Sequence, residues 1–261
     1  MVCEPHDAAA QFDAPGGPDA ALCLHGLTGS PYEVRPVAEA LADAGLRVRA
    51  PRLVGHGRTP KALQHTRWDD WLAAARRHFN ELAEEHERIY LVGLSMGALC
   101  AIALAHERGA RVAGVVSMAT PLELEWKSQA TLRLARRIPL ADVLPFLAKT
   151  GGPDVSDAAV AAAMPSYDQI PLAAAASMLD GQLTALDRIP RLGVPFLVQH
   201  GRYDHVAPVH NAHRLMKMLR TPHRRLVVYP RSWHVLPLDV EHEAVARDIV
   251  DFVAQTTGAS Q

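Results

Sequence analysis

The chain has 261 residues, of which 49% are hydrophobic and 21% are charged. This length and composition fit one globular domain, or one domain with a modest insertion, and they exclude a disordered or fibrous chain. The 27 Lys and Arg residues are balanced by 28 Asp and Glu residues, whereas a nucleic-acid-binding protein shows a clustered basic excess, so we expect no nucleic-acid partner.

Short apolar runs alternate with longer segments of helical pattern along the chain. The runs lie at Ala20–Leu24, Arg47–Ala50, Ile89–Val92, Val112–Met118, Val194–Gln199 and Arg225–Tyr229. Several are apolar on both faces, which is typical of buried parallel strands. The helical segments are Pro31–Ala44, Thr66–Glu87 (with a capping box of Thr66 and Asp69), Met96–Arg108, Val209–Leu219 and Val240–Ala254. The alternation predicts an α/β fold, with a mostly parallel sheet flanked by helices on both faces.

The alternation is interrupted once, between Pro121 and Arg191. This stretch shows no convincing strand, and prolines and glycines separate four expected helices: Leu122–Ile138, Leu140–Lys149, Asp157–Met164 and Leu172–Ile189. The sequence therefore predicts a core formed by residues 1–120 and 191–261 and a helical cap formed by residues 121–190. We expect the cap to cover the carboxyl ends of the strands, where ligands bind in such folds.

The cysteines and the N-terminus bear on metal binding and on location. Cys3, Cys23 and Cys100 are odd in number and fit no metal-site spacing, so we expect no metal and no disulfide framework. Residues 1–17 contain no apolar run of signal-peptide length, and no stretch is long enough to cross a bilayer. The expected location is the cytoplasm, a reducing compartment.

The segment Gly93–Gly97 reads Gly-Leu-Ser-Met-Gly, between a predicted strand and a predicted helix. In that context G-x-S-x-G is typical of a nucleophile elbow, a tight turn that needs small residues beside the serine. The turn raises the serine hydroxyl above the sheet, at the positive end of the following helix. The motif therefore predicts that Ser95 is a nucleophile, and the alternative is an ordinary N-capping serine.

A serine nucleophile needs a base, and the base needs an acidic residue that orients it. Asp204 and His234 follow the last two predicted strands, Val194–Gln199 and Arg225–Tyr229, in the order expected for this elbow: serine, acid, histidine. Asp187 and Asp239 compete for the role of the acid, but the first lies in the cap and the second follows the histidine. His234 stands in the loop directly after the last strand, unlike the other nearby histidines: His205, His210, His213, His223 and His242.

The tetrahedral intermediate of acyl transfer requires backbone donors for its oxyanion. We expect these to be the amides of Met96, next to the nucleophile, and of Leu27, in the loop after the first strand. Gly26 lets that loop turn back toward Ser95. His25 is expected to brace the loop by hydrogen bonding and not to act as a base.

Together these residues resemble the α/β-hydrolase superfamily, and more narrowly the bacterial carboxylesterases and monoacylglycerol lipases. The shared segments are residues 24–30, 55–57, 68–71, 93–97, 201–204 and 232–235. The resemblance implies hydrolysis of carboxylic esters with short to medium acyl chains, or of monoglycerides, without a cofactor. It assigns the triad to Ser95, Asp204 and His234, and the oxyanion hole to Leu27 and Met96. Trp233 replaces a glycine found in many relatives, and we expect its bulk to narrow the pocket near the base.

The expected partner is a small-molecule ester. Candidates for the substrate pocket are Trp126, Leu144, Phe146, Met164, Ile170, Val206 and Val235. The alternative that such apolar cap residues only pack the cap onto the core stays open, as do the oligomeric state and transient contact with a lipid surface. Two other functions also stay open: the same triad acting on a thioester, an amide or a C–C bond, and a non-catalytic receptor.

Overall fold

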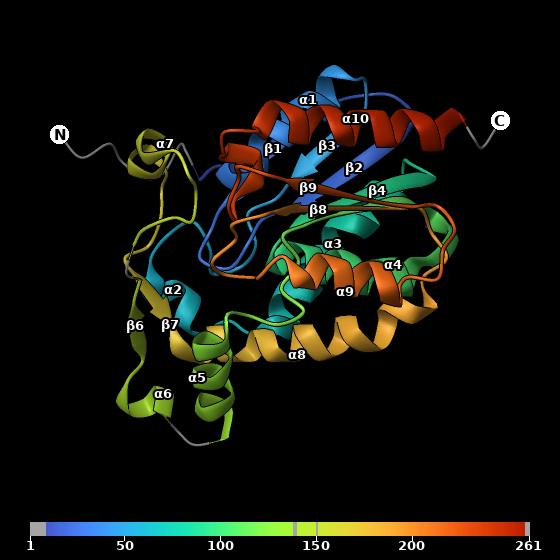
Figure 1. Cartoon of the computed structure of the whole chain (residues 1–261). Helices are drawn as coiled ribbons and strands as arrows, with labels where there is room; N and C mark the ends of the chain where they lie inside the picture. The colour runs from blue at the N-terminus through green and yellow to red at the C-terminus, as the bar shows by residue number, and fades with distance from the viewer. Residues whose placement is uncertain (1–8, 138–139, 150, 259–261) are drawn as a thin grey trace.

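The computed structural model describes residues 9–137, 140–149 and 151–258, so Cys3, Ile138 and Pro139 lie outside the described residues (Figure 1). A seven-stranded sheet has the order β1-β3-β2-β4-β5-β8-β9, and β6 and β7 form a separate two-stranded sheet. The strands are β1 (Phe12–Ala14), β2 (Asp19–Leu24), β3 (Arg47–Ala50), β4 (Arg88–Leu94), β5 (Val112–Met118), β6 (Phe146–Ala148), β7 (Gln169–Pro171), β8 (Phe196–Gly201) and β9 (Arg224–Tyr229). The helices are α1 (Arg35–Asp43), α2 (Pro60–Gln64), α3 (Trp68–Ala83), α4 (Met96–Arg108), α5 (Trp126–Arg137), α6 (Leu140–Val143), α7 (Ala158–Ala163), α8 (Leu172–Arg188), α9 (His210–Met218) and α10 (His242–Gly258).

The larger sheet confirms the predicted fold class. All its strand pairs are parallel except β1–β3, and the six predicted strands form with ends displaced by at most two residues. The sequence does not predict β1, because three residues are too few to show a strand periodicity. This edge strand pairs antiparallel with β3, and Asp13 forms ion pairs with Arg47 and Arg49.

Each face of the sheet carries its own hydrophobic core. On one face, α1 and α10 contribute Val37, Leu41, Val245 and Ile249 to a cluster with the strands. On the other face, α3, α4, α8 and α9 form a second cluster. Figure 1 shows these two layers on either side of the sheet. The predicted covering of both faces by helices is therefore confirmed.

The start of α3 differs from the predicted capping box. Asp70 and not Asp69 closes the first turn, since its carboxylate accepts a hydrogen bond of 2.9 Å from the Arg67 amide. The Thr66 hydroxyl donates to the Leu63 carbonyl and accepts from the indole N–H of Trp71 at 2.9 Å. A buried tryptophan needs a partner for its N–H, and that requirement takes Thr66 away from the helix cap.

The expectation that no strand forms between Pro121 and Arg191 is wrong. The predicted helix Leu140–Lys149 ends early as α6, and Phe146–Ala148 instead pairs antiparallel with Gln169–Pro171. Pro145 disfavours helical backbone in the residue before it, which separates α6 from β6. Strands of three residues have no period to detect, and these two form because the chain brings them together.

The segment between β5 and β8 lies against the loops that follow the core strands. Its smaller elements, from α5 to β7, gather at one side of the molecule, and α8 runs back along α3 and α4 (Figure 1). Within the described residues no helix is both long and apolar enough to traverse a lipid bilayer.

Helix α8 packs closely on α3 at Gly181. A Cβ atom on Gly181 would lie 2.7 Å from two ring carbons of Trp68, which is itself buried. Gly-to-Ala in a helix ordinarily stabilises by about 1 kcal/mol. Overpacking a rigid buried ring costs about 1–3 kcal/mol, so the contact outweighs the helix propensity.

We expect Gly181→Ala to lower the free energy of unfolding by about 1 kcal/mol in urea denaturation, the net of these two effects. In a Trp68→Phe background, where the smaller ring leaves room, the same substitution should be neutral or stabilising. A Gly181→Ala protein more stable than the wild type would contradict the packing argument.

Candidate active site

Ser95 stands on a sharp turn between β4 and α4. Its backbone angles are φ 54° and ψ −117°, a conformation that residues other than glycine rarely adopt. Its amide donates to the Met118 carbonyl at 2.9 Å, which ties the turn to the end of β5. The side chain lies at the amino end of α4, where the helix dipole favours negative charge.

Two glycines give this turn the room that the sequence motif predicts. A Cβ atom on Gly93 would lie 2.4 Å from the backbone of Gly97. A Cβ atom on Gly97 would lie 2.1 Å from the carbonyl oxygen of Leu24, at the end of β2. Any side chain at either position would force β2, β4 and α4 apart, so the elbow depends on both glycines.

Asp204 and His234 meet in loops that follow β8 and β9. The Nδ1 atom of His234 lies 2.7 Å from Oδ2 of Asp204. The other carboxylate oxygen accepts hydrogen bonds from the amides of Val206 at 2.9 Å and Ala207 at 2.7 Å. The carboxylate is thus fixed by its own loop, and Nδ1 of the imidazole donates to it, which leaves Nε2 as the basic nitrogen.

A further glycine brings the two loops together. A Cβ atom on Gly201 would lie 2.0 Å from the carbonyl oxygen of Trp233 and 2.5 Å from that of Ser232. The last residue of β8 therefore lets the backbone before His234 pass directly over it. The Trp233 ring points to His205, whose ring centroid is 4.6 Å away.

The charges of this pair stabilise one another. Burial raises the pKa of Asp204, but the adjacent His234 and a hydrogen bond from His200 outweigh it and hold the pKa well below its usual range. Burial lowers the pKa of His234, but the Asp204, Asp154 and Glu33 carboxylates outweigh burial and raise that pKa. Asp204 is therefore ionised at neutral pH, and the imidazolium form of His234 is favoured.

The competing acids have other partners. Asp239 accepts hydrogen bonds from the amides of Trp233 at 2.6 Å and Ser156 at 3.0 Å, so it joins the His234 loop to the segment between β5 and β8. Asp187 lies on the surface at the end of α8 and pairs with Arg191. The structure brings Asp204, and neither of these, to the His234 ring.

The loop after β2 is braced by His25, and this prediction is confirmed. Its Nε2 accepts a hydrogen bond of 3.1 Å from the Leu53 amide, and its Nδ1 donates to the Gly26 carbonyl at 2.9 Å. Burial lowers the pKa of His25 to about 4, so the ring is neutral at pH 7. A neutral ring with both nitrogens engaged serves as a brace.

The two predicted oxyanion amides lie on facing elements. Met96 is the first residue of α4, and the first amides of a helix have no partner within it. Leu27 lies in the loop after β2, and its amide makes no hydrogen bond within the described part of the chain. Gly26, the residue before Leu27, lies beside the elbow, because a Cβ atom on it would be 3.4 Å from the Ser95 Cβ atom.

Glu33 is a site residue that the sequence reasoning misses. It lies in a single 3-10 turn, Pro31–Val34, and is only 8% exposed. Its carboxylate accepts a hydrogen bond of 3.0 Å from the Gly26 amide. Nothing in the local sequence marks this glutamate as buried, because a polar residue beside a short turn is ordinarily solvated.

The seven predicted substrate-pocket residues are not brought together. Trp126 and Leu144 are exposed, at 72% and 44%. Met164 and Val235 are buried in the same cluster, on the face covered by α1 and α10. Val206, at 37% exposed, lies two residues beyond Asp204.

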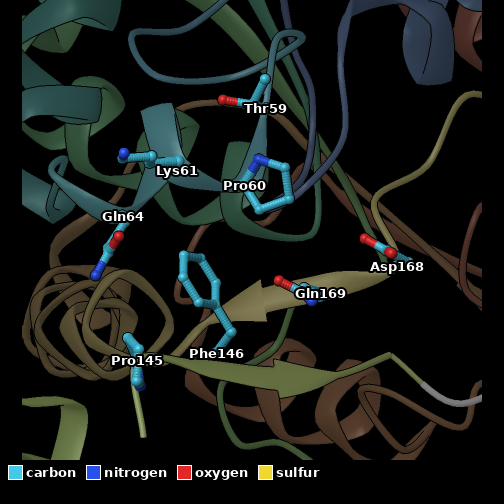
Figure 2. A pocket seen from close by; sticks show the side chains of 8 residues that line it. All are labelled: Thr59, Pro60, Lys61, Gln64, Pro145, Phe146, Asp168 and Gln169. Atoms are coloured by element: carbon cyan, nitrogen blue, oxygen red, sulfur yellow. The ribbon is translucent and has the colours of Figure 1, made fainter. Parts of the chain in front are cut away.

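Phe146 and Ile170 lie in the two-stranded sheet. Phe146 points into a hollow of about 610 Å³ between α2 and this sheet, which Figure 2 shows. The hollow is lined by Thr59, Pro60, Lys61, Gln64, Pro145, Phe146, Asp168 and Gln169, and not by Ser95, Asp204 or His234. Ile170 packs against the cluster on the opposite face from Met164. The structure therefore assigns these residues no common pocket.

Asp154, from the segment between β5 and β8, is hydrogen-bonded to both loops of the acid–base pair. Its carbonyl accepts from the amides of His234 and Val235, both at 3.1 Å. Its carboxylate accepts from the His205 amide at 3.0 Å and pairs with the His205 ring at 2.8 Å. This segment is therefore part of the framework that holds the site.

Comparison with known proteins identifies relatives along most of the chain. The model of a family described as serine aminopeptidase, S33, matches residues 17–241. The chain is 28% identical to a thermostable monoacylglycerol lipase from Bacillus sp. (strain H-257) over 96% of each protein. It is 27% identical to a carboxylesterase from Bacillus subtilis (strain 168), over 93% of this chain and 95% of that one. A solved structure from work on the metagenome-derived lipolytic enzymes LipS and LipT superposes with a TM-score of 0.88 at 28% identity, over 95% of this chain and 98% of that one.

Because the backbone at Ser95 is strained, we expect glycine to be more stabilising than alanine at this position. Because glycine relieves the positive φ, Ser95→Gly should be more stable than Ser95→Ala by about 1–3 kcal/mol in urea denaturation. At Ser128, an exposed helical position, the same pair should show the ordinary order, with alanine more stable by about 1 kcal/mol. Equal stabilities of the two Ser95 variants would show that the turn carries no strain.

Proposed function

This chain belongs to the serine aminopeptidase S33 family, and we propose that it is a carboxylic ester hydrolase that acts through Ser95, His234 and Asp204. The observation that carries the proposal is the 2.7 Å hydrogen bond between His234 Nδ1 and Asp204 Oδ2, in loops at the same sheet edge as the strained Ser95. Its relatives named as a monoacylglycerol lipase and a carboxylesterase favour esters as substrates, with short to medium acyl chains or monoglycerides.

The mechanism is two-step acyl transfer. Nε2 of His234 takes the proton of the Ser95 hydroxyl as its oxygen attacks the ester carbonyl, and Asp204 stabilises the imidazolium that forms. The proton then passes to the leaving alcohol. Water, deprotonated by His234, attacks the acyl-enzyme and frees Ser95.

The oxyanion of each tetrahedral intermediate is held by the amides of Leu27 and Met96 in this proposal. One amide belongs to the braced loop after β2 and the other to the amino end of α4, so neither reorganises during the reaction. Donors fixed in advance stabilise charge without the cost of ordering them at the moment of reaction.

We assign residues 121–190 as a cap over this site and the rest of the chain as the catalytic core. The contacts of Asp154 and Ser156 with the loops after β8 and β9 support this division. We place the acyl group between cap and core, with Val206 and Val235, which flank the acid and the base in sequence, nearer to it than the exposed Trp126.

Hydrolysis of p-nitrophenyl esters from acetate to palmitate tests the proposed function. Wild type should be active, and Ser95→Ala should lose activity on the order of 10⁶-fold, because the nucleophile is removed. Ser128→Ala, which removes an exposed serine, should match the wild type. The activity profile over chain length reports the size of the acyl pocket.

A fluorophosphonate probe separates the remaining outcomes. Labelling of wild type but not of Ser95→Ala, without ester hydrolysis, would keep the nucleophile and transfer the proposal to thioesters, amides such as aminoacyl p-nitroanilides, or C–C substrates. Absence of both labelling and hydrolysis would favour a non-catalytic receptor.

The activity of the wild type should depend on pH through His234. The base must be neutral to accept the serine proton, so kcat/KM should rise with pH as the imidazolium loses its proton. Because its neighbouring carboxylates raise the pKa of His234, the midpoint should lie above the ordinary histidine value of about 6.5. Initial rates with an uncharged ester measure this profile, and a flat rate from pH 5 to 8 would contradict the assignment.

A further inference from the structure

Glu33 is a buried carboxylate beside the proposed nucleophile. Its Oε2 atom accepts the Gly26 amide hydrogen bond at 3.0 Å, one residue before the proposed oxyanion donor Leu27. A Cβ atom on Gly26 would lie 3.3 Å from this oxygen and 3.4 Å from the Ser95 Cβ atom. The carboxylate and the nucleophile therefore flank the same residue of the loop.

The loop leaves space that fits this carboxylate. A Cβ atom on Gly29 would lie 2.0 Å from Oε2 and 2.2 Å from Cδ of Glu33. The Gly29 amide closes the turn by donating to the Gly26 carbonyl at 3.2 Å. The turn from Gly26 to Gly29 is thus folded around the Glu33 side chain.

A neutral side chain could accept the same amide hydrogen bond without the cost of burying a charge. Burial raises the pKa of Glu33, and three groups oppose this effect: the Gly26 amide, Lys149 and His234. Lys149 comes from the proposed cap, just after β6, and its ammonium group also donates to the Ser166 hydroxyl at 2.8 Å. Lys149 of the proposed cap and His234 of the core therefore both favour the ionised form of this carboxylate.

The base lies among several carboxylates. The charged groups that act on His234 are three carboxylates: Asp204, which also contacts His200, Asp154, which also contacts His205, and Glu33, whose ionised form Lys149 favours. A carboxylate near the developing oxyanion would oppose it, and the cation of Lys149 offsets this repulsion. The same carboxylate favours the imidazolium that His234 becomes during acylation.

We propose that Glu33 is a positioning residue for the ester hydrolysis proposed above: it holds the turn that presents the Leu27 amide, and its charge favours the imidazolium form of His234. The inference rests on the proposed function and adds a second role to the loop after β2. The two parts of the role are separable, since a glutamine keeps the acceptor and removes the charge.

Three variants test the proposal: Glu33→Gln, Glu33→Ala and the control Glu39→Gln. Glu39 lies nearby on α1, where its exposed side chain pairs with Arg35. The first readout is the pH dependence of kcat/KM on a p-nitrophenyl ester. The second is the titration of the His234 ring by NMR of isotope-labelled protein, with the signal assigned by a His234→Gln variant.

Glu33→Gln should retain most of the wild-type kcat/KM at pH values where His234 is neutral. The pH range in which kcat/KM rises and the midpoint of the His234 titration should both move to lower pH, because removing a negative charge destabilises the imidazolium. Glu33→Ala should lose kcat/KM on the order of 10²-fold at all pH values, since the oxyanion turn is no longer held. Glu39→Gln should match the wild type in both readouts.

Gly29→Ala gives an independent route if Glu33→Ala does not fold. Its Cβ atom displaces the Glu33 side chain, so it should lower kcat/KM as Glu33→Ala does, and it should cost little further when Glu33 is already alanine. Identical pH profiles and His234 titrations for Glu33→Gln, Glu39→Gln and wild type would overturn the charge role. Full activity of Glu33→Ala or of Gly29→Ala would overturn the positioning role.

The NMR titration separates this proposal from the proposed function. A His234 titration that moves in Glu33→Gln while the wild type hydrolyses no ester would reject ester hydrolysis and keep the electrostatic coupling. Ester hydrolysis that depends on Ser95, with a His234 titration unaffected by Glu33→Gln, would keep ester hydrolysis and reject the electrostatic coupling.

Discussion

The contact of α4 with the sheet at Gly97 sets the geometry of the whole site. The helix backbone passes so close to the Leu24 carbonyl that only hydrogen fits between them. This approach forces the chain from β4 into α4 through the strained Ser95 conformation. It also sets the first amide of α4 opposite the loop after β2. A helix packed less closely on β2 would move Ser95 and the first amide of α4 away from Leu27, the other predicted oxyanion donor.

Electrostatics around the acid–base pair follow from burial combined with specific partners. Asp204 is buried, but its carboxylate accepts hydrogen bonds from two backbone amides and from the His234 ring, so its charge is compensated. His234 is buried too, and its neighbouring carboxylates more than offset the burial effect on its pKa. Low exposure strengthens each of these interactions, because little water remains to screen them.

The segment between β5 and β8 is bound to this arrangement through polar contacts. Asp154 and Ser156 reach the loops after β8 and β9 directly or through Asp239. Helix α8 anchors the same segment to the core by packing on α3 at Gly181. The segment that we propose as the cap is therefore also a support for the His234 loop.

The sequence by itself determined the α/β class, the six core strands and the elbow at Ser95, because long apolar runs and G-x-S-x-G within a strand–helix context have local physical causes. It also pointed to Asp204 and His234 as neighbours, because loops after parallel strands converge at one sheet edge. Only the tertiary structure decided the pairing of β6 with β7, the burial of Glu33 beside Gly26 and the scatter of the predicted pocket residues. These features depend on contacts between segments distant in the chain, or on the way a short turn is buried, and neither leaves a periodic signal in the sequence.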